Sequence, residues 1–149
     1  PLAARRSLAL ELGATHVIDP MAGDVTTALR EILPDGVDFA FDTSGRIDAI
    51  EAALRALAPR GMLGLVGVPP KAEDALSINI AGMITFGQRV IGIMEGDSDP
   101  QTFIPELIKA HRDGNFPFDR LVATFPLSDI NVAIAAQKRG ECVKVVLIP

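Results

Sequence analysis

The sequence predicts an α/β protein with a mostly parallel β-sheet. Short apolar segments alternate with amphipathic ones over the first two-thirds of the chain, and this order is typical of right-handed βαβ units. The segment MLGLVGV at 62–68 is apolar almost throughout, as expected of a strand that is buried on both faces. The 149 residues are 48% hydrophobic and 22% charged, which favours one folded domain with a hydrophobic core over two large domains.

Hydrophobic periodicity and turn residues predict the elements of the first half of the chain. Gly13 is placed to end the first helix, and Asp24 is placed to cap the second. The third helix presents its apolar residues on one face and stops at the break Pro59-Arg60-Gly61. The expected elements are a helix at about 2–12, a strand at 15–20, a helix at 25–33, a strand in VDFAFDTSG at 37–45, a helix that starts at Arg46 and includes Leu57, and a strand at 62–68.

The second half of the chain is expected to end in a helix followed by a strand. Residues 77–87 are apolar but poorly periodic, so a strand and a short helix both remain open there. Ser128 is placed to cap the last helix, and Gly140 is placed to end it. The other expected elements are a strand at 89–94, a turn in GDSDP, a helix at about 101–112, a strand at 121–127 and a final strand at 142–148.

Charge and composition limit the classes of partner. The net charge of -5 disfavours nucleic acid and anionic membranes, which bind by neutralisation of phosphates, and leaves small molecules as the expected partners. The single cysteine, Cys142, excludes an internal disulfide and any zinc site built on paired cysteines of this chain. No apolar run approaches the ~18 residues of a membrane span, and Arg5, Arg6 and Glu11 interrupt the first segment. A cytoplasmic location is expected.

The stretch RGMLGLVGVPP at 60–70 is rich in glycine, yet it does not fit a phosphate-binding loop. Such a loop follows a strand and opens a helix, so that free backbone N–H groups face the phosphate. Here Gly64 lies inside the expected strand and prolines follow Gly67. Two interpretations remain open. Gly67 and the prolines could expose backbone groups to a planar ligand, or they could form a tight strand exit that binds nothing.

Ligands of open parallel sheets bind beyond the carboxyl ends of the strands. These ends are Asp19, 42–45, 67–70 and the turn after Ile93. Asp42 could shape a ligand crevice there, although a strand-end aspartate more often satisfies a turn. EGDSDP lacks the spacing of a calcium loop and is expected to be a turn that caps the next helix. His16, His111 and Cys142 are expected to be structural or exposed, because no partner stands at metal-ligand or catalytic spacing.

Four segments occur together in this order: ELGATHVIDP, VDFAFDTSG, RGMLGLVGVPP and KRGECVKVVLIP. In order and spacing they resemble the medium-chain dehydrogenase/reductase family, and most of all its zinc-dependent alcohol dehydrogenases of the aryl (benzyl) alcohol type. The resemblance covers essentially the whole chain. It implies a partial Rossmann-like, doubly wound sheet that lacks its first two strands, followed by a C-terminal helix–strand return. Residues 1–149 would then be a partial NAD(P)-binding domain, with about 115–149 belonging to the catalytic domain.

The resemblance also implies which residues bind a cofactor, NAD(H) or NADP(H). It places Arg5 near the adenosine ribose, and it places Ser44 and Arg46 at the loop beside the adenine. The strand end Val66, Gly67 and Val68 would pass the nicotinamide, as would Ile93 and Glu95. Lys144 would reach the pyrophosphate, where other members of the family carry arginine. The glycine fingerprint and the ligands of a catalytic zinc would lie upstream of Pro1, so no metal ligand and no catalytic residue is expected in this chain.

The implied activity is hydride transfer between a primary or aromatic alcohol and nicotinamide, carried out by a longer enzyme; this chain alone is expected to be inactive. Two alternatives remain open: a zinc-independent quinone or enoyl reductase of the same family, and a non-catalytic nucleotide-binding or dimerisation module. The family further implies a homo-oligomer formed through residues 77–94, where an edge strand would pair with its copy.

Overall fold

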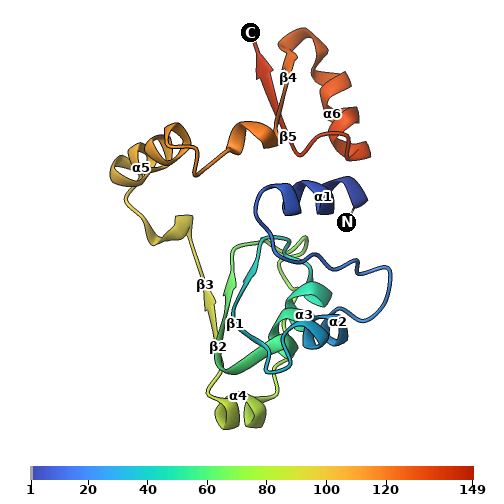
Figure 1. Cartoon of the computed structure of the whole chain (residues 1–149), viewed down its shortest axis with the longest axis vertical. Helices are drawn as coiled ribbons and strands as arrows, with labels where there is room; N and C mark the ends of the chain where they lie inside the picture. Colours follow the sequence, from blue (N-terminus) through green and yellow to red (C-terminus); the bar gives the residue numbers. More distant parts are fainter. Residues whose placement is uncertain (1) are drawn as a thin grey trace. The chain divides into compact units, whose positions relative to one another are not determined.

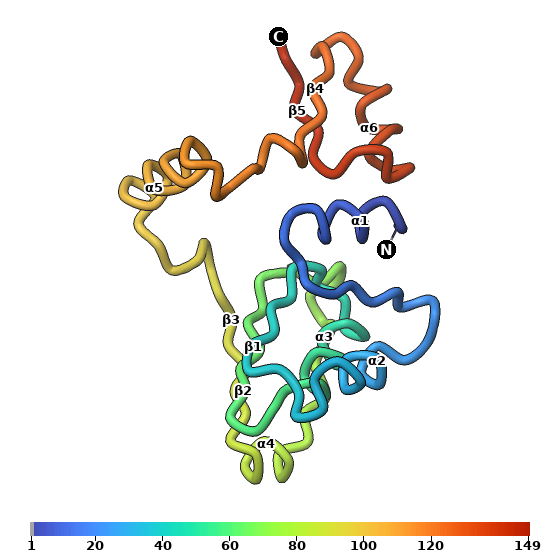
Figure 2. The backbone as a smooth tube through the Cα atoms, in the orientation of Figure 1, coloured from blue at the N-terminus to red at the C-terminus, as the bar shows by residue number. Residues whose placement is uncertain are grey.

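A computed structural model describes residues 2–149, which divide into two units. One unit is Ile18–Asp97, and the other joins the residues up to Val17 with Ser98–Pro149. Figure 1 shows the elements of both units, and Figure 2 traces the backbone in the same orientation.

The unit Ile18–Asp97 is built on a three-stranded parallel sheet with the order β1-β2-β3. Helix α3 connects β1 to β2, and α2 packs against α3 (Figure 1). Asp24 caps α2 by accepting a hydrogen bond from the backbone N–H of Thr27 at 2.7 Å, as expected from the sequence. The bounds are α2 Val25–Ile32, β1 Val37–Asp42, α3 Ile47–Ala56, β2 Leu57–Leu65, α4 Ile80–Phe86, β3 Arg89–Gly92 and the 3₁₀ turn η1 Glu95–Asp97.

The core of this unit lies between α3 and one face of the sheet. Ile50 from α3 packs with Leu57 and Leu63 from β2, and Leu63 is completely buried. The register pairs Leu63 with Ala40 on one side and Val90 on the other, so all three residues share the covered face. The opposite face of β1 is exposed, because Phe39 and Phe41 keep 73% and 62% of their surface in contact with solvent.

The other unit contains a parallel strand pair joined by a helix. Strands β4 and β5 pair in parallel, and α6 runs between them in sequence and contacts both. Ala133 and Ala136 are the buried residues of α6, and Gly140 ends the helix in the left-handed conformation (φ 77°), as predicted. The bounds are α1 Ala3–Glu11, α5 Pro100–Arg112, η2 Phe118–Leu121, β4 Val122–Pro126, η3 Leu127–Asp129, α6 Ile130–Arg139 and β5 Lys144–Ile148.

The fold class predicted from the sequence is confirmed: an α/β chain with parallel strands, consistent with a partial Rossmann-like sheet. Residues 77–87, left open between strand and helix, contain the short helix α4. The acidic turn caps the next helix as expected, because the Asp99 carboxylate accepts a hydrogen bond from the Gln101 N–H at 3.1 Å.

Three local predictions are wrong. Residues 15–20 form no strand, because no described strand pairs with them and an isolated strand leaves its N–H and C=O groups without partners. The third helix stops before Leu57, which already belongs to β2; the break Pro59-Arg60-Gly61 is an irregularity inside that strand, where the register shifts and Arg60 has φ 66°. The residue that precedes α6 is Asp129, and Ser128 does not cap the helix.

Candidate functional site

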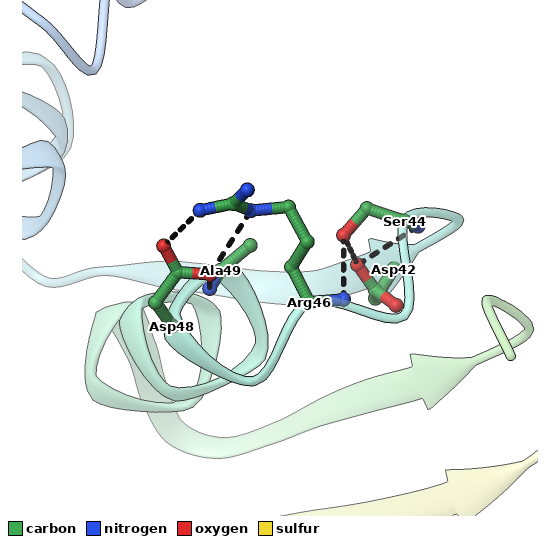
Figure 3. Close-up of polar contacts among 5 residues, drawn as sticks. All are labelled: Asp42, Ser44, Arg46, Asp48 and Ala49. Carbon is green, nitrogen blue, oxygen red and sulfur yellow. Dashed lines mark hydrogen bonds and ion pairs between the residues drawn. The ribbon is translucent and has the colours of Figure 1, made fainter. Parts of the chain in front are cut away.

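The loop that follows β1 is organised by the carboxylate of Asp42, the buried polar residue at the end of the strand. Oδ1 accepts hydrogen bonds from the hydroxyl and the backbone N–H of Ser44, at 2.6 and 3.1 Å. Oδ2 accepts from the backbone N–H of Gly45 at 2.9 Å. Figure 3 shows Asp42 and Ser44 turned toward one another within this loop. The carboxylate is therefore engaged by its own loop and acts as a positioning residue.

Burial and hydrogen bonding act on Asp42 in opposite directions. Burial raises the pKa of the carboxyl, while hydrogen bonds from the Ser44 hydroxyl, the Gly45 N–H and the Ser44 N–H lower it, and the net result is a pKa below the ordinary value. The side chain is consequently a hydrogen-bond acceptor at neutral pH and has no proton to donate.

The same residue ties the exit of β2 to the exit of β1. The backbone carbonyl of Asp42 accepts hydrogen bonds from the N–H groups of Val66 and Gly67, each at 3.0 Å. The two exits approach so closely that only glycine fits: a Cβ on Gly67 would stand 2.1 Å from the Gly45 nitrogen, and a Cβ on Gly45 would stand 2.2 Å from the Val68 oxygen. The loops therefore form one continuous rim at the carboxyl ends of the strands.

The rim presents backbone and apolar side chains to solvent. Val66 and Val68 are 41% and 85% exposed, and the backbone of Val68 makes no hydrogen bond with any other residue of the described chain. Ile93 continues the rim beyond β3, and its N–H donates to the Leu65 carbonyl at 2.9 Å. Glu95 follows with φ 52°, a left-handed conformation that side chains rarely adopt.

Arg46, which the family resemblance places beside the adenine, forms an ion pair with Asp48, a residue that was not among the expected site residues. Its Nε and Nη2 donate to Oδ1 and Oδ2 of Asp48, at 3.1 and 2.5 Å, and both side chains are exposed (Figure 3). This hydrogen bonding raises the pKa of Arg46 and lowers the pKa of Asp48. The spacing Arg-x-Asp at a helix start could have indicated this pair. An acidic residue in the first turn is also favoured there by the positive end of the helix dipole.

The structure brings Arg5 close to the start of β5 in the other unit. Arg5 Nη2 donates to the backbone carbonyl of Cys142 at 3.3 Å, two residues before Lys144. Lys144 is exposed and forms no ion pair with another described residue. Arg5 and Lys144 are both exposed and belong to the same unit. The other expected site residues belong to the unit Ile18–Asp97: Ser44, Arg46, Val66, Gly67, Val68, Ile93 and Glu95.

The described residues do not fit a metal site. Across residues 2–149, no three histidine, cysteine or acidic side chains are grouped as a metal ion requires. In the same part of the chain, no helix has both the length and the apolar composition needed to cross a bilayer.

A family model described as zinc-binding dehydrogenase matches residues 1–110. The chain belongs to this family. The geraniol dehydrogenase of Castellaniella defragrans is 41% identical to it over 150 residues, which cover 99% of this chain and 40% of the relative. This zinc-binding dehydrogenase chain therefore spans about 40% of the length of the relatives that it matches.

Two solved structures support the same assignment. Benzyl alcohol dehydrogenase from Acinetobacter calcoaceticus is 32% identical with a TM-score of 0.93, over 98% of this chain and 40% of that one. A zinc-binding dehydrogenase from Sinorhizobium meliloti, solved with NADP bound, is 26% identical with a TM-score of 0.87, over 99% of this chain and 43% of that one. The resemblance of this chain to alcohol dehydrogenases of the benzyl alcohol type, expected from the sequence, is confirmed.

Proposed function

We propose that this chain is the cofactor-side part of an NAD(P)-dependent, zinc-type alcohol dehydrogenase that transfers hydride between a primary or aromatic alcohol and nicotinamide. The observation that carries the proposal is the rim formed by the exits of β1 and β2, which exposes backbone groups at the carboxyl ends of parallel strands. The likeness of the chain to a dehydrogenase that was solved with NADP bound supports a nicotinamide dinucleotide as the cofactor.

In this proposal the chain binds and orients the cofactor and does no acid–base chemistry. Val66, Gly67 and Val68 would lie along the nicotinamide, with Ile93 and Glu95 beside them. When bound, the nicotinamide supplies the hydride acceptor or donor. Asp42 would hold the rim in the conformation that the ring meets, because its carboxylate and carbonyl bind both exits.

Four residues would serve the rest of the dinucleotide. Arg5, Ser44 and Arg46 would border the adenosine, and Lys144 would meet the pyrophosphate. The zinc of the complete enzyme would be held by residues outside this chain. Within the proposal, residues 115–149 belong to the catalytic domain of the whole enzyme. The whole enzyme is cytoplasmic.

Cofactor binding is tested with Lys144→Ala. We expect the affinity of the chain for NADH or NADPH to fall about tenfold, which equals ~1.4 kcal/mol, because a charge-assisted hydrogen bond to phosphate is lost. Titration monitored by nicotinamide fluorescence measures this, with Arg5→Ala as a second variant. Lys138→Ala is the matched control, since it removes an exposed lysine of the same unit outside the proposed site.

The outcomes of this titration separate the candidate functions. A folded chain that binds neither cofactor would support the non-catalytic dimerisation module over the dehydrogenase. Equal affinities for Lys144→Ala and Lys138→Ala would remove Lys144 from the site. Lys144→Arg should bind at least as tightly as the natural chain, because a guanidinium can hold phosphate with two parallel bonds. The zinc-independent reductase lacks the metal ligands of the leading proposal. The sequence of the whole enzyme decides between the two, because zinc-ligand cysteines would support the dehydrogenase and their absence would support the reductase.

We also propose that residues 77–94 form an interface between copies of the chain. Ile80 and Ile84 on α4 are 72% and 76% exposed, and β3 is an edge strand of the described sheet. Ile84→Glu is expected to shift the protein toward monomer in sedimentation velocity, because a carboxylate would be buried without a partner. Met21→Glu is the matched control, as Met21 is 87% exposed and lies outside the segment. A monomeric natural chain, or equal behaviour of the two variants, would contradict the interface.

A further inference from the structure

A cavity of ≈ 930 Å³ lies within the unit Ile18–Asp97, at the end of the sheet where the strands begin. Leu57, the first residue of β2, lines it, as does Gln88 immediately before β3. The strands are parallel, so this end is opposite to the rim that carries the proposed cofactor site. Residues of α2, α3 and α4 contribute to the lining, together with residues of the loops that precede and follow these helices. The cavity is thus separate from the proposed dinucleotide site.

One wall of the cavity carries a half-buried cation, Arg30. Its Nη1 donates to the Pro34 carbonyl at 3.0 Å, and its Nη2 donates to the carbonyls of Arg55 and Leu57, each at 3.3 Å. These bonds fix the guanidinium but do not neutralise it, because Arg30 forms no ion pair with a described residue, and its Nε–H has no acceptor there. A fixed guanidinium without a counter-ion is favourably placed for a carboxylate.

Two acidic residues, Glu51 and Asp35, also line the cavity. Glu51 stands 3.7 Å from Arg55, the second arginine of the wall, so these two charges offset one another. Asp35 is exposed to solvent. Arg30 is therefore the half-buried charge of the lining that has no ion-pair partner among the described residues, while the charge of Asp35 is screened by solvent.

The apolar part of the lining belongs largely to α4, and the polar residues Asn79 and Gln88 flank it. Gly82, Met83 and Phe86 line the cavity at the i, i+1, i+4 positions of one helix face, and Leu54 from α3 joins them. Phe86 is half exposed, so part of its ring is available to a ligand. An apolar wall beside a single fixed charge suits a ligand that has an apolar body and one anionic group.

We propose that this cavity binds a small monocarboxylate with an apolar chain or ring. The carboxylate pairs with Arg30, and the apolar body lies on Leu54, Met83 and Phe86. Such a ligand removes the apolar wall from water and supplies the counter-ion that Arg30 lacks.

The proposal is tested with octanoate and an ¹⁵N-labelled sample of the full chain. We expect octanoate to shift the amide resonances of α2, α3 and α4, and not those of the rim at Val66 and Gly67. Gly82→Leu should weaken binding at least tenfold, because the added side chain enters the cavity while its Cβ meets only ordinary contacts of 3.5 Å or more. Arg30→Gln should weaken binding by about tenfold through loss of the charge.

Two matched variants and one matched ligand complete the experiment. Gly23→Leu adds the same side chain at a position where nothing lies within 4 Å of the new Cβ, and Arg112→Gln removes an exposed charge of α5, outside the cavity and outside 77–94. Both should bind octanoate as the natural chain does. The neutral analogue 1-octanol should bind at least tenfold more weakly than octanoate. If Arg30→Gln does not fold, Gly82→Leu and the alcohol still decide the question.

Three results would overturn the proposal. Octanoate could leave the amides of the cavity unshifted, Gly82→Leu could bind as well as Gly23→Leu, or octanol could match octanoate. Loss of cofactor binding in any of these variants would instead bear on the proposed dehydrogenase function, so the two proposals fail independently.

Discussion

Replacement of Gly67 by alanine is expected to destabilise the chain by about 2–3 kcal/mol, a cost typical of overpacking a tight site. The added Cβ would stand 2.1 Å from the Gly45 nitrogen, 2.6 Å from the Ser44 nitrogen and 2.7 Å from Asp42 Oδ2. Two of these atoms belong to backbone, so no side-chain rotation can relieve the contact. The exits of β1 and β2 must separate, and the hydrogen bonds from Val66 and Gly67 to the Asp42 carbonyl are then lost.

Urea unfolding followed by circular dichroism measures this effect as a lower midpoint. Gly92→Ala is the matched control, because Gly92 is the last residue of the parallel strand β3 and has nothing within 4 Å of its Cβ position. We expect the control to change the free energy of unfolding by no more than about 0.5 kcal/mol. Equal midpoints for the two variants would mean that the rim does not hold its close packing in solution. In the proposed dehydrogenase, Gly67→Ala should also weaken binding of NADH, since the rim would no longer keep its shape.

The parts of the fold that could be predicted are those set by local chemistry. Asp24 and the acidic turn that contains Asp99 indicated two helix starts, because an aspartate before an apolar, periodic segment accepts hydrogen bonds from the first free N–H groups of the helix. Gly140 indicated a helix end, because glycine adopts the left-handed conformation (φ 77° here) without strain. The residues of the rim could be placed because strand ends of a parallel sheet meet at one edge.

The parts that could not be predicted depend on residues far apart in the sequence. The segment at 15–20 has the composition of a strand, but a strand requires a partner, and the described sheet provides none for it. The hydrogen bond from Arg5 to Cys142 spans 137 positions, and no local pattern signals it. The close approach of Gly45 and Gly67 was equally hidden, because each glycine alone resembles an ordinary turn residue.

Replacement of Asp42 by asparagine is expected to lower stability at pH 7 by about 1–3 kcal/mol, the cost of buried donors left without an acceptor. Both carboxylate oxygens accept hydrogen bonds, from Ser44 and from Gly45. An asparagine amide offers one acceptor oxygen, and its NH₂ group would face an N–H or O–H donor. Asp38→Asn is the matched control on the same strand, since the Asp38 side chain is exposed and forms no hydrogen bond or ion pair with a described residue.

The pH dependence of this difference identifies the carboxylate as its source. Because the folded-state pKa of Asp42 is lowered, the stability that it contributes is present above the unfolded-state value of about 3.9 and is lost as the pH falls through the folded-state pKa. The natural chain and Asp42→Asn should therefore differ fully at pH 7 and converge below about pH 4. Urea midpoints measured from pH 7 to pH 3 provide the comparison. A gap that stays constant over this range would show that the charged form of Asp42 does not stabilise the loop, and a gap equal to that of Asp38→Asn would remove Asp42 from its role in holding the two strand exits together.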